Sequence, residues 1–446
     1  MSSASPSSPS SSAKKKVILL ALTTALCLLG DSMLYILLPI FWPEWGLSGL
    51  WEVGILLSVN RFVRLPLNPL VGRLYQKIPL QAGLYLAVLL AAATTIGYGM
   101  AHGLWIWILL RACWGLAWSL LRVGGLQYLV QYSEERTRGE WIGTYNGLYR
   151  LGSLVGVLFG GIGATVIGHR GIAIFFGIGS LFGLALLAFG FAKRERVEEP
   201  VAGTEEAPAT QAQAAATQAS QAGKDSTAST KLDPALSLRP RWDKQLLLIL
   251  ASGFTVAMVF QGLVTSSLSH FVTRNIGTLS LWGLALTAAT CAGLIQSARW
   301  CWEPFLASRI GRWSDGPRGR VPLFLGALLA ATILLPLTPL ALPLSLWLVA
   351  LMLLLMTATA LNTLTDSLAA DNLRSKGVGL LATYTLAQDL GAAVGPAFGY
   401  GLPLVHLPID VAFPVCAALL LLLGVVWVAR SRNSPISNNE KTTKPL

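Results

Sequence analysis

The sequence predicts an all-α integral membrane protein of twelve transmembrane helices, arranged as two six-helix bundles related by a pseudo-twofold axis. Three observations lead to this fold class. Hydrophobic residues make up 54% of the 446 residues and charged residues only 12%, which is about half the charged share of a soluble protein. Twelve apolar runs are each close to the length of about 20 residues that crosses a bilayer. The two halves of the chain also repeat one another.

The apolar runs give the expected order of elements along the chain. A Ser- and Pro-rich tail at 1–16 precedes the first bundle at 17–192, and a flexible linker at 193–244 leads to the second bundle at 245–430 and a tail at 431–446. The linker is rich in Ala, Gln, Thr and Glu without apolar periodicity, which is typical of a disordered segment. The twelve helices are expected at 17–40, 51–72, 80–100, 104–130, 142–167, 171–192, 245–270, 280–307, 321–341, 344–369, 378–402 and 409–430.

The distribution of basic residues predicts the orientation of the chain. If both termini are cytoplasmic, the inner tails and loops hold 25 Lys and Arg residues and the outer loops hold two. Such an excess of positive charge marks the cytoplasmic side of a membrane protein. We therefore expect a multi-pass protein of a bacterial cell membrane, inner or plasma, with both termini in the cytoplasm.

An internal repeat relates the two halves. Residues 144–160, TYNGLYRLGSLVGVLFG, match residues 383–399, TYTLAQDLGAAVGPAFG, with eight identities in 17 positions at an offset of 239. The same offset places the dipeptide Gly72-Arg73 on Gly311-Arg312. Two separate matches at one offset indicate a duplicated six-helix unit, which is a known plan of membrane transporters.

A polar loop motif follows the second helix of each half. In the second half, GRWSDGPRGR has the spacing G-x-x-x-D-x-x-x-G-R, whereas the first-half copy, GRLYQKIPLQ, keeps Gly72 and Arg73 but has Gln76 at the acidic position. This motif resembles the cytoplasmic loop signature of the major facilitator superfamily. The second-half residues that fill the signature are Gly311, Asp315, Gly319 and Arg320.

Two helices carry further motifs that resemble those of the same family. RACWG resembles its Arg-x-x-x-Gly pattern through Arg111 and Gly115. GSLVGVLFGG resembles the Gly-x-x-x-Gly-Pro-x-x-Gly-Gly pattern of exporters through Gly152 and Gly156, with Val157 in place of the proline. The alternative role of such glycines is close helix packing. The matching residues of the eleventh helix are Gly391, Gly395 and Pro396.

The resemblance implies a secondary transporter that works by alternating access between its two bundles. In the family, the first, fourth, seventh and tenth helices line a central cavity, whereas the third, sixth, ninth and twelfth are the outer ones. The interiors of these outer runs contain no charged residue in this sequence, as expected of helices that face lipid. The resemblance therefore places Asp31, Arg111 and Arg122 in the cavity.

The repeat also predicts two ion pairs between the bundles. The offset of 239 places Arg64 on Glu303 and Arg150 on Asp389. In the family's architecture the second helix packs on the eleventh and the fifth on the eighth, so that Arg64 meets Asp389 and Arg150 meets Glu303. Buried charges are usually paired, and we expect these pairs to gate the cavity by forming when one side closes. The alternative is that the four charges stay hydrated and never touch.

The remaining charges point to the solute and to the coupling ion. Arg61 maps onto the uncharged Trp300 and is expected, with Arg111, to contact the solute. Arg122 lies about three turns from Arg111 on the same helix face. Asp31 lies near mid-membrane, where burial favours its protonated form and a nearby arginine favours its charged form, so we expect it to carry the proton. The alternative role of Asp31 is a hydrogen bond that positions the first helix.

These features predict proton-coupled export of a small amphipathic or anionic solute. The alternatives are proton-coupled uptake of an organic anion and a non-transporting sensor or scaffold with the same fold. The sequence has no G-x-x-x-x-G-K-[ST] phosphate loop, and its cysteines and histidines lack metal-ligand spacing. We therefore expect no enzymatic activity, cofactor, metal or nucleic-acid partner. The expected partners are the solute, protons and the lipid bilayer, and the expected working unit is a monomer.

Overall fold

The first half of the chain folds into helices that follow one another closely. The computed structural model describes residues 11–132, 138–191, 243–281, 284–316, 319–376 and 379–432. Its first-half helices are α1 (Ser11–Phe41), α2 (Leu50–Leu74), α3 (Leu80–Met100), α4 (Leu104–Tyr132), α5 (Arg138–Val166), α6 (Gly168–Ser180) and α7 (Phe182–Phe191). A single residue separates α6 from α7, and the two form one crossing.

The second half repeats this plan and adds a small hairpin. Its first crossing is continuous and consists of α9 (Lys244–Val256), the π-helix η1 (Ala257–Val264) and α10 (Thr265–Asn275). The strands β1 (Leu279–Leu281) and β2 (Leu284–Leu286) then pair antiparallel. The remaining elements are α11 (Ala288–Ser314), α12 (Arg320–Leu334), η2 (Leu335–Leu337), α13 (Leu344–Lys376), α14 (Gly379–Gly401), η3 (Leu402–Val405), η4 (Ile409–Val411) and α15 (Ala412–Arg432).

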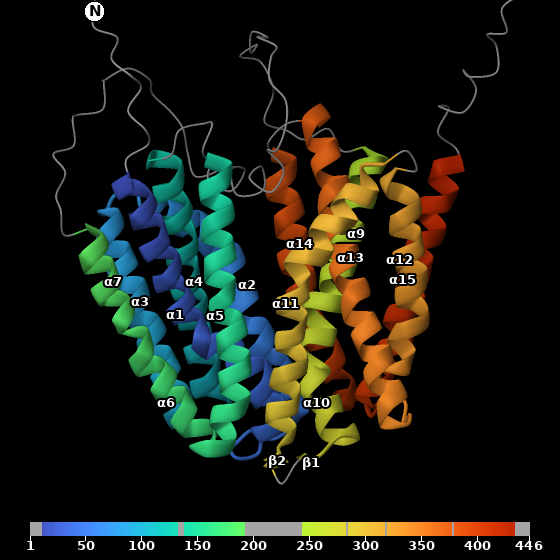
Figure 1. The fold of residues 1–446 in the computed structure, drawn as a ribbon, viewed down its shortest axis with the longest axis horizontal. Coiled ribbons are helices and arrows are strands. Elements are labelled where there is room, and N and C mark those ends of the chain that lie inside the picture. Colours follow the sequence, from blue (N-terminus) through green and yellow to red (C-terminus); the bar gives the residue numbers. More distant parts are fainter. Residues whose placement is uncertain are drawn as a thin grey trace, which may run out of the picture.

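The two sets of helices stand side by side. Figure 1 shows α1–α7 on one side of the molecule and α9–α15 on the other, with α1 beginning and α15 ending at the same end. The β1–β2 hairpin lies at the opposite end, which we call the hairpin end. The end that holds the start of α1 and the finish of α15 is called the terminal end.

The helices are long and apolar enough to cross a membrane. Among the described residues, nine helical segments qualify as membrane spans by length and hydropathy. Three more long helices, α2, α11 and α14, run alongside them (Figure 1). Interior charges such as Arg64, Glu303 and Asp389 lower the hydropathy of these three. Together the nine spans and these three helices are consistent with the twelve crossings expected, and the predicted all-α membrane fold is confirmed.

Several boundaries differ from those expected, and the largest differences include the ends of α11 and α13, which lie seven residues beyond 307 and 369. The eighth helix, expected at 280–307, begins at Ala288, because the preceding apolar residues form the hairpin and Thr287 accepts a hydrogen bond from the backbone N–H of Thr290. A short apolar run is compatible with a strand or a helix. The first helix begins at Ser11 rather than 17, because lysine favours helix and extends it beyond the apolar run. Most of the expected linker and tails lies outside the described residues.

Glycines let one helix pair pack closely in each half. A Cβ atom at Gly152 or Gly156 on α5 would overlap the backbone carbonyls of Ala25 and Leu29 on α1. Small residues allow such close approach between membrane helices. The repeat therefore uses the same packing in both halves. In the second half the corresponding contacts join Gly391 to Phe254 and Gly395 to Met258.

The two halves meet where α2 packs on α14 and α5 on α11. At the hairpin end the contact is tight: a Cβ at Gly54 would lie 2.7 Å from the carbonyl oxygen of Pro396, and the hydroxyls of Thr165 and Thr287 lie 2.7 Å apart. Halfway along α5, however, the side chain of Arg150 is 54% exposed. Since a charge halfway along a membrane helix is not expected to face lipid, we infer that the interface opens at this point onto a water-accessible space between the halves, which we call the central space.

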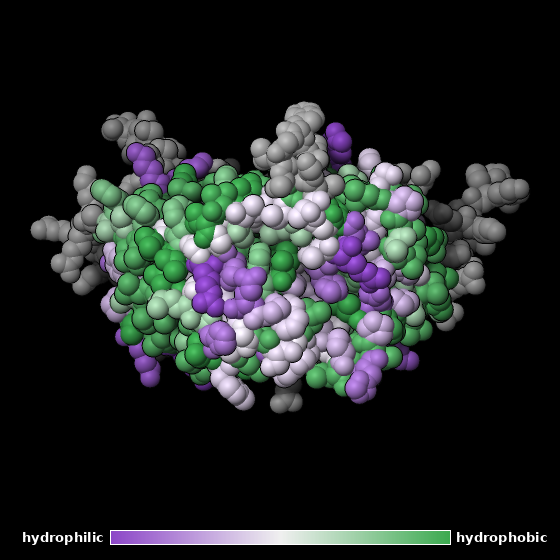
Figure 2. Space-filling model, turned by 90° about the horizontal axis from the view of Figure 1, so that it is seen from below, coloured by the Kyte–Doolittle hydropathy of each residue, from purple (hydrophilic) through white to green (hydrophobic). Residues whose placement is uncertain are grey.

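The outer surface matches a membrane environment. Figure 2 views the molecule from the hairpin end and shows hydrophobic side chains around the perimeter, with hydrophilic ones gathered over the central part. The helices expected to face lipid carry large exposed apolar side chains, and examples are Leu86 on α3, Phe175 on α6, Leu329 on α12 and Leu422 on α15.

Candidate functional site

A buried ion pair lies at the centre of the first half. Arg111 on α4 is fully buried and donates through Nη1 to Oδ1 of Asp31 on α1, and its Nε donates to the carbonyl oxygen of Leu56 at 2.9 Å. Asn60 on α2 donates to the same Asp31 oxygen at 3.2 Å. The Asp31 side chain keeps 13% of its surface exposed. This carboxylate therefore joins three helices and remains accessible.

Arg61, one residue beyond Asn60, lies beside this pair but outside it. Its Nη2 donates to the hydroxyl of Tyr35 at 3.4 Å. Asp31 and Asp389 act on Arg61 electrostatically, yet among the described residues no carboxylate forms an ion pair with it. The structure therefore separates the two arginines that the sequence groups as solute contacts, because Arg111 is sequestered and Arg61 is half-buried.

Arg122 lies three turns along α4 from Arg111, next to a group of aromatic rings. Its Nη1 donates to the side-chain oxygen of Asn146 at 2.7 Å, and its guanidinium lies 5.3 Å from the centre of the Tyr149 ring. Trp118 contacts the same tyrosine edge to face, at 5.8 Å between ring centres. Arg122 thus binds neutral partners, and within the described part of the chain it has no carboxylate partner.

Both predicted contacts between the halves are within ion-pair distance. Arg64 Nη2 lies 3.8 Å from Asp389 Oδ1, and Arg150 Nη1 lies 3.5 Å from Glu303 Oε1. All four side chains are partly exposed. A second arginine shares the Glu303 carboxylate, because Arg299 Nε lies 3.8 Å from its other oxygen.

Sequence reasoning missed Arg299 and Asn60 as members of the site. Both could have been found, since Asn60 maps onto Arg299 at the repeat offset and Arg299 precedes Glu303 by four residues, one helical turn. Arg299 also donates to the hydroxyl of Thr265 at 3.2 Å. At this repeat position both bundles therefore carry a polar side chain that contacts a carboxylate: Asn60 contacts Asp31, and Arg299 contacts Glu303.

A second carboxylate, outside the predicted site, lies in the other half. Oδ1 of Asp366 on α13 accepts hydrogen bonds from the Tyr384 hydroxyl at 2.8 Å and from Gln388 Nε2 at 2.9 Å, both on α14. Nearby, Gln261 in η1 donates to Asn362 on α13 at 3.0 Å. A π-helix often marks a functional position in a membrane or soluble helix.

The loop motif of the second half forms an ion-pair network. Arg320 contacts Asp315 at 2.8 Å and Asp371, at the end of α13, at 3.2 Å. Arg320 also donates to the carbonyl oxygen of Ser367 at 2.6 Å. The network therefore ties the loop to α13, and Asp371 is a partner that the motif alone does not reveal. Gly319 has a φ of 72°, which a residue with a side chain rarely adopts.

The first-half copy of the motif is built differently. Gly72 is buried and Arg73 is exposed at the end of α2, and among the described residues Arg73 forms no ion pair. Tyr75 instead anchors this end, since its hydroxyl donates to the carbonyl oxygen of Leu120 at 2.9 Å. Burial raises the pKa of Tyr75 above its ordinary value.

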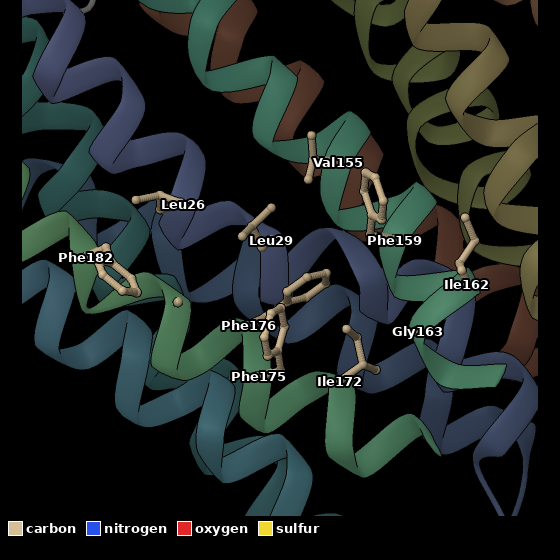
Figure 3. A pocket seen from close by; sticks show the side chains of 11 residues that line it. Leu26, Leu29, Val155, Phe159, Ile162, Gly163, Ile172, Phe175, Phe176 and Phe182 are labelled. Carbon is tan, nitrogen blue, oxygen red and sulfur yellow. The ribbon is translucent and has the colours of Figure 1, made fainter. Parts of the chain in front are cut away.

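An apolar pocket of about 420 Å³ lies apart from these charges. Figure 3 shows side chains of α1, α5, α6 and α7 lining it, among them Leu26, Phe159 and Phe175. None of the charged residues above lines it. The exposed rings on helices that cross the membrane indicate a recess that faces lipid. Within the described residues, no group of three His, Cys, Asp or Glu side chains could hold a metal ion.

Comparisons with known proteins agree with this architecture. A model of the Major Facilitator Superfamily matches residues 20–386. Uncharacterized MFS-type transporters of Enterobacter sp. (strain 638) and of Escherichia coli O45:K1 (YcaD, strain S88) are each 28% identical over 142 residues. These matches cover 32% of this chain and only 37% of each relative.

Solved structures share the fold over nearly the whole chain. A bacterial homolog of the human lysosomal transporter Spinster, in an inward-facing, unoccupied conformation, has a TM-score of 0.66 at 13% identity, covering 95% of this chain and 98% of that one. The peptide transporter POT in complex with sulfate has a TM-score of 0.65 at 14% identity, covering 94% of both chains. At this identity the likeness shows the fold.

Proposed function

The chain belongs to the major facilitator superfamily, and on that premise we propose that this multi-pass membrane transporter couples the export of a small amphipathic or anionic solute to proton movement. It works as a monomer by alternating access in a bacterial cell membrane. In the proposed orientation both termini are cytoplasmic and the hairpin end faces outward. The solute contacts Arg61 and Arg122, and Asp31 carries the proton.

The observation that supports proton coupling is the unequal burial of the Asp31–Arg111 pair. Arg111 is enclosed on all sides, whereas Asp31 retains 13% exposure. Protonation of Asp31 removes the charge that balances Arg111, and a buried charge without its partner is strongly destabilising. The protonated protein therefore favours a conformation in which Arg111 is hydrated or finds another anion. This links proton binding to the position of the bundles.

The ion pairs between the halves suit a gate that must open. At 3.8 and 3.5 Å and with partly exposed side chains, the Arg64–Asp389 and Arg150–Glu303 pairs are weak contacts. They stabilise the hairpin-end-closed arrangement without locking it. Export is the proposed direction because residues 152–161 resemble the glycine pattern of exporters.

The variant Asp31→Asn tests the coupling. The amide keeps the size and a hydrogen-bonding oxygen but cannot titrate, so we expect it to abolish solute movement driven by a pH gradient while sparing solute binding and solute exchange at equal concentrations. Proteoliposomes containing a pH-sensitive dye measure the pH-driven transport, and the shift in melting temperature on adding solute measures solute binding. Intact pH-driven transport would remove Asp31 from the mechanism. Asp410→Asn, at an exposed ion pair with Arg274, is the matched control.

A further inference from the structure

The charges within the membrane helices are sorted by half. Within the twelve expected spans, and leaving aside Glu52, Asp410 and Arg430 within two residues of a span end, the first half contributes five arginines and one aspartate. The second half contributes one arginine and three acids. The first-half group is Asp31, Arg61, Arg64, Arg111, Arg122 and Arg150, and the second-half group is Arg299, Glu303, Asp366 and Asp389. The two walls of the central space thus carry opposite net charge.

Ion pairs account for most of these charges. Asp31 pairs with Arg111, Asp389 pairs with Arg64, and Glu303 is shared by Arg150 and Arg299. Within the described residues, three charges remain outside any ion pair. They are Arg61 and Arg122 on the first wall and Asp366 on the second.

The two remaining arginines are accessible and hold only neutral partners. Arg61 binds a tyrosine hydroxyl and Arg122 an asparagine amide oxygen, and both side chains are half-buried. A guanidinium has five N–H donors, so each keeps donors for another group. Arginine favours the planar geometry of carboxylates and phosphates.

The remaining carboxylate has the opposite character. Tyr384 and Gln388 both donate to Oδ1 of Asp366, and Gln388 also donates to the Tyr384 hydroxyl at 3.0 Å. These bonds fix the carboxylate in place, while Asp366 itself is exposed. Arg150 and Glu303 act on it electrostatically but form no ion pair with it. Oδ2 is therefore available to a cation.

We propose that the solute is a zwitterion, with an anionic group held by Arg61 or Arg122 and a protonated amine held by Asp366. This rests on the proposed transport function and narrows its solute class. When the space closes and water leaves, a solute of one charge would satisfy one wall and leave the other charge unpaired, which is costly in a dry environment. A zwitterion pairs with both walls and bridges the two halves. Complementary charges of this kind select against solutes that lack one of them.

The rings beside Arg122 extend the proposal to the body of the solute. Trp118 and Tyr149 are half-buried and lie between Arg122 and Arg64, whose guanidinium is 6.0 Å from the Trp118 ring centre. They offer apolar surface next to the anion-binding groups. An amphipathic zwitterion with an apolar or aromatic side chain fits this wall.

Matched sets of amino compounds test the proposal on the purified full-length protein. Phenylalanine, 6-aminohexanoic acid and alanylphenylalanine are compared with their N-acetyl, amide and doubly capped forms, which remove the positive charge, the negative charge or both. We expect the zwitterion of at least one set to raise the melting temperature most, with an apparent affinity about tenfold or more above its capped forms. Equal or stronger effects of N-acetyl anions or of cationic amides, or no effect of any compound, would overturn the proposal.

Asp366→Asn locates the amine. This variant should lose the preference for the zwitterion over its N-acetyl form, Asp366→Glu should retain it, and Asp410→Asn should leave it unchanged. A preference that persists in Asp366→Asn would contradict the assignment even if zwitterions bind. The melting temperature without solute reports whether each variant is folded. Because the measurement uses no proton gradient, its failure is distinct from a failure of proton coupling at Asp31.

Discussion

The difference between Arg111 and Arg64 shows how burial decides what an ion pair can do. Arg111 is fully enclosed against Asp31, so loss of either partner leaves a charge in a dry environment. Arg64 and Asp389 are 14% and 32% exposed at 3.8 Å, where water replaces a lost partner. In the proposed mechanism the first pair therefore couples a proton to the fold, and the second pair opens and closes.

Exchange of Arg64 and Asp389 tests this second pair. We expect Arg64→Asn and Asp389→Asn each to lower transport, and the double variant Arg64→Asp with Asp389→Arg to restore it, because the exchange preserves the attraction. The coupling should be about 0.5–1 kcal/mol, roughly two- to fivefold in rate. The same exchange at Arg274 and Asp410, whose pair lies 2.7 Å apart within one half, should leave transport unchanged. Failure of the exchange to restore transport would argue against direct contact.

At the residue scale, the repeat supplies the constraint from which the two contacts between the halves are predicted. The offset of 239 maps Arg64 onto Glu303 and Arg150 onto Asp389. In the structure each arginine lies at ion-pair distance from the acid that corresponds to the other arginine. Nothing comparable marks Asp366, because its partners Tyr384 and Gln388 lie on another helix and are neutral. A carboxylate near a helix end looks solvated unless the partner helix is known.

At the scale of elements, long apolar helices are predictable from the sequence and local changes of backbone geometry are not. The π-helix η1 lies inside a crossing whose high hydropathy gives no sign of a change in backbone geometry. Its wider turns change the direction in which side chains project, and Gln261 reaches Asn362 from this segment. The hairpin formed by β1 and β2 was likewise not predictable from the sequence, since its residues are as apolar as those of a membrane helix.

Gly152→Ala tests the close packing of α5 on α1. The added methyl group would overlap the backbone of Ala25, which cannot move aside as a side chain can, so we expect a loss of about 1–3 kcal/mol in stability. A lower melting temperature and a lower yield of folded protein would be measured. Gly147→Ala is the control on the same helix, because a Cβ there meets no atom within 4 Å. Equal stability of both variants would contradict the packing role.

At the scale of the whole molecule, the contacts between the halves described above run from Arg64–Asp389 and Arg150–Glu303 at mid-helix to Thr165–Thr287 at the hairpin end. A disulfide there should hold this arrangement. We expect the variant Thr165→Cys with Thr287→Cys to cross-link on oxidation, because the two hydroxyls lie 2.7 Å apart on different halves. Transport should then stop and should return on reduction. The two substitutions are made in a variant from which the native cysteines have been removed; these are Cys27, Cys113, Cys291, Cys301 and Cys416.

Each single-cysteine variant controls for the substitutions themselves. These variants should transport equally with and without oxidant. Full activity of the cross-linked protein would show that the hairpin end need not open, and alternating access between the halves would be wrong.

The reversed charges at the interface also bear on whether either half could pair with a copy of itself. Arg64 faces Asp389, and Asp389 is the residue that corresponds to Arg150 in the repeat. Arg150 faces Glu303, and Glu303 is the residue that corresponds to Arg64. Two copies of the first half would set arginine against arginine at both points, and two copies of the second would set acid against acid. Each half is thus complementary to the other and not to itself. A symmetric dimer of either half alone would therefore set like charges against each other at this interface.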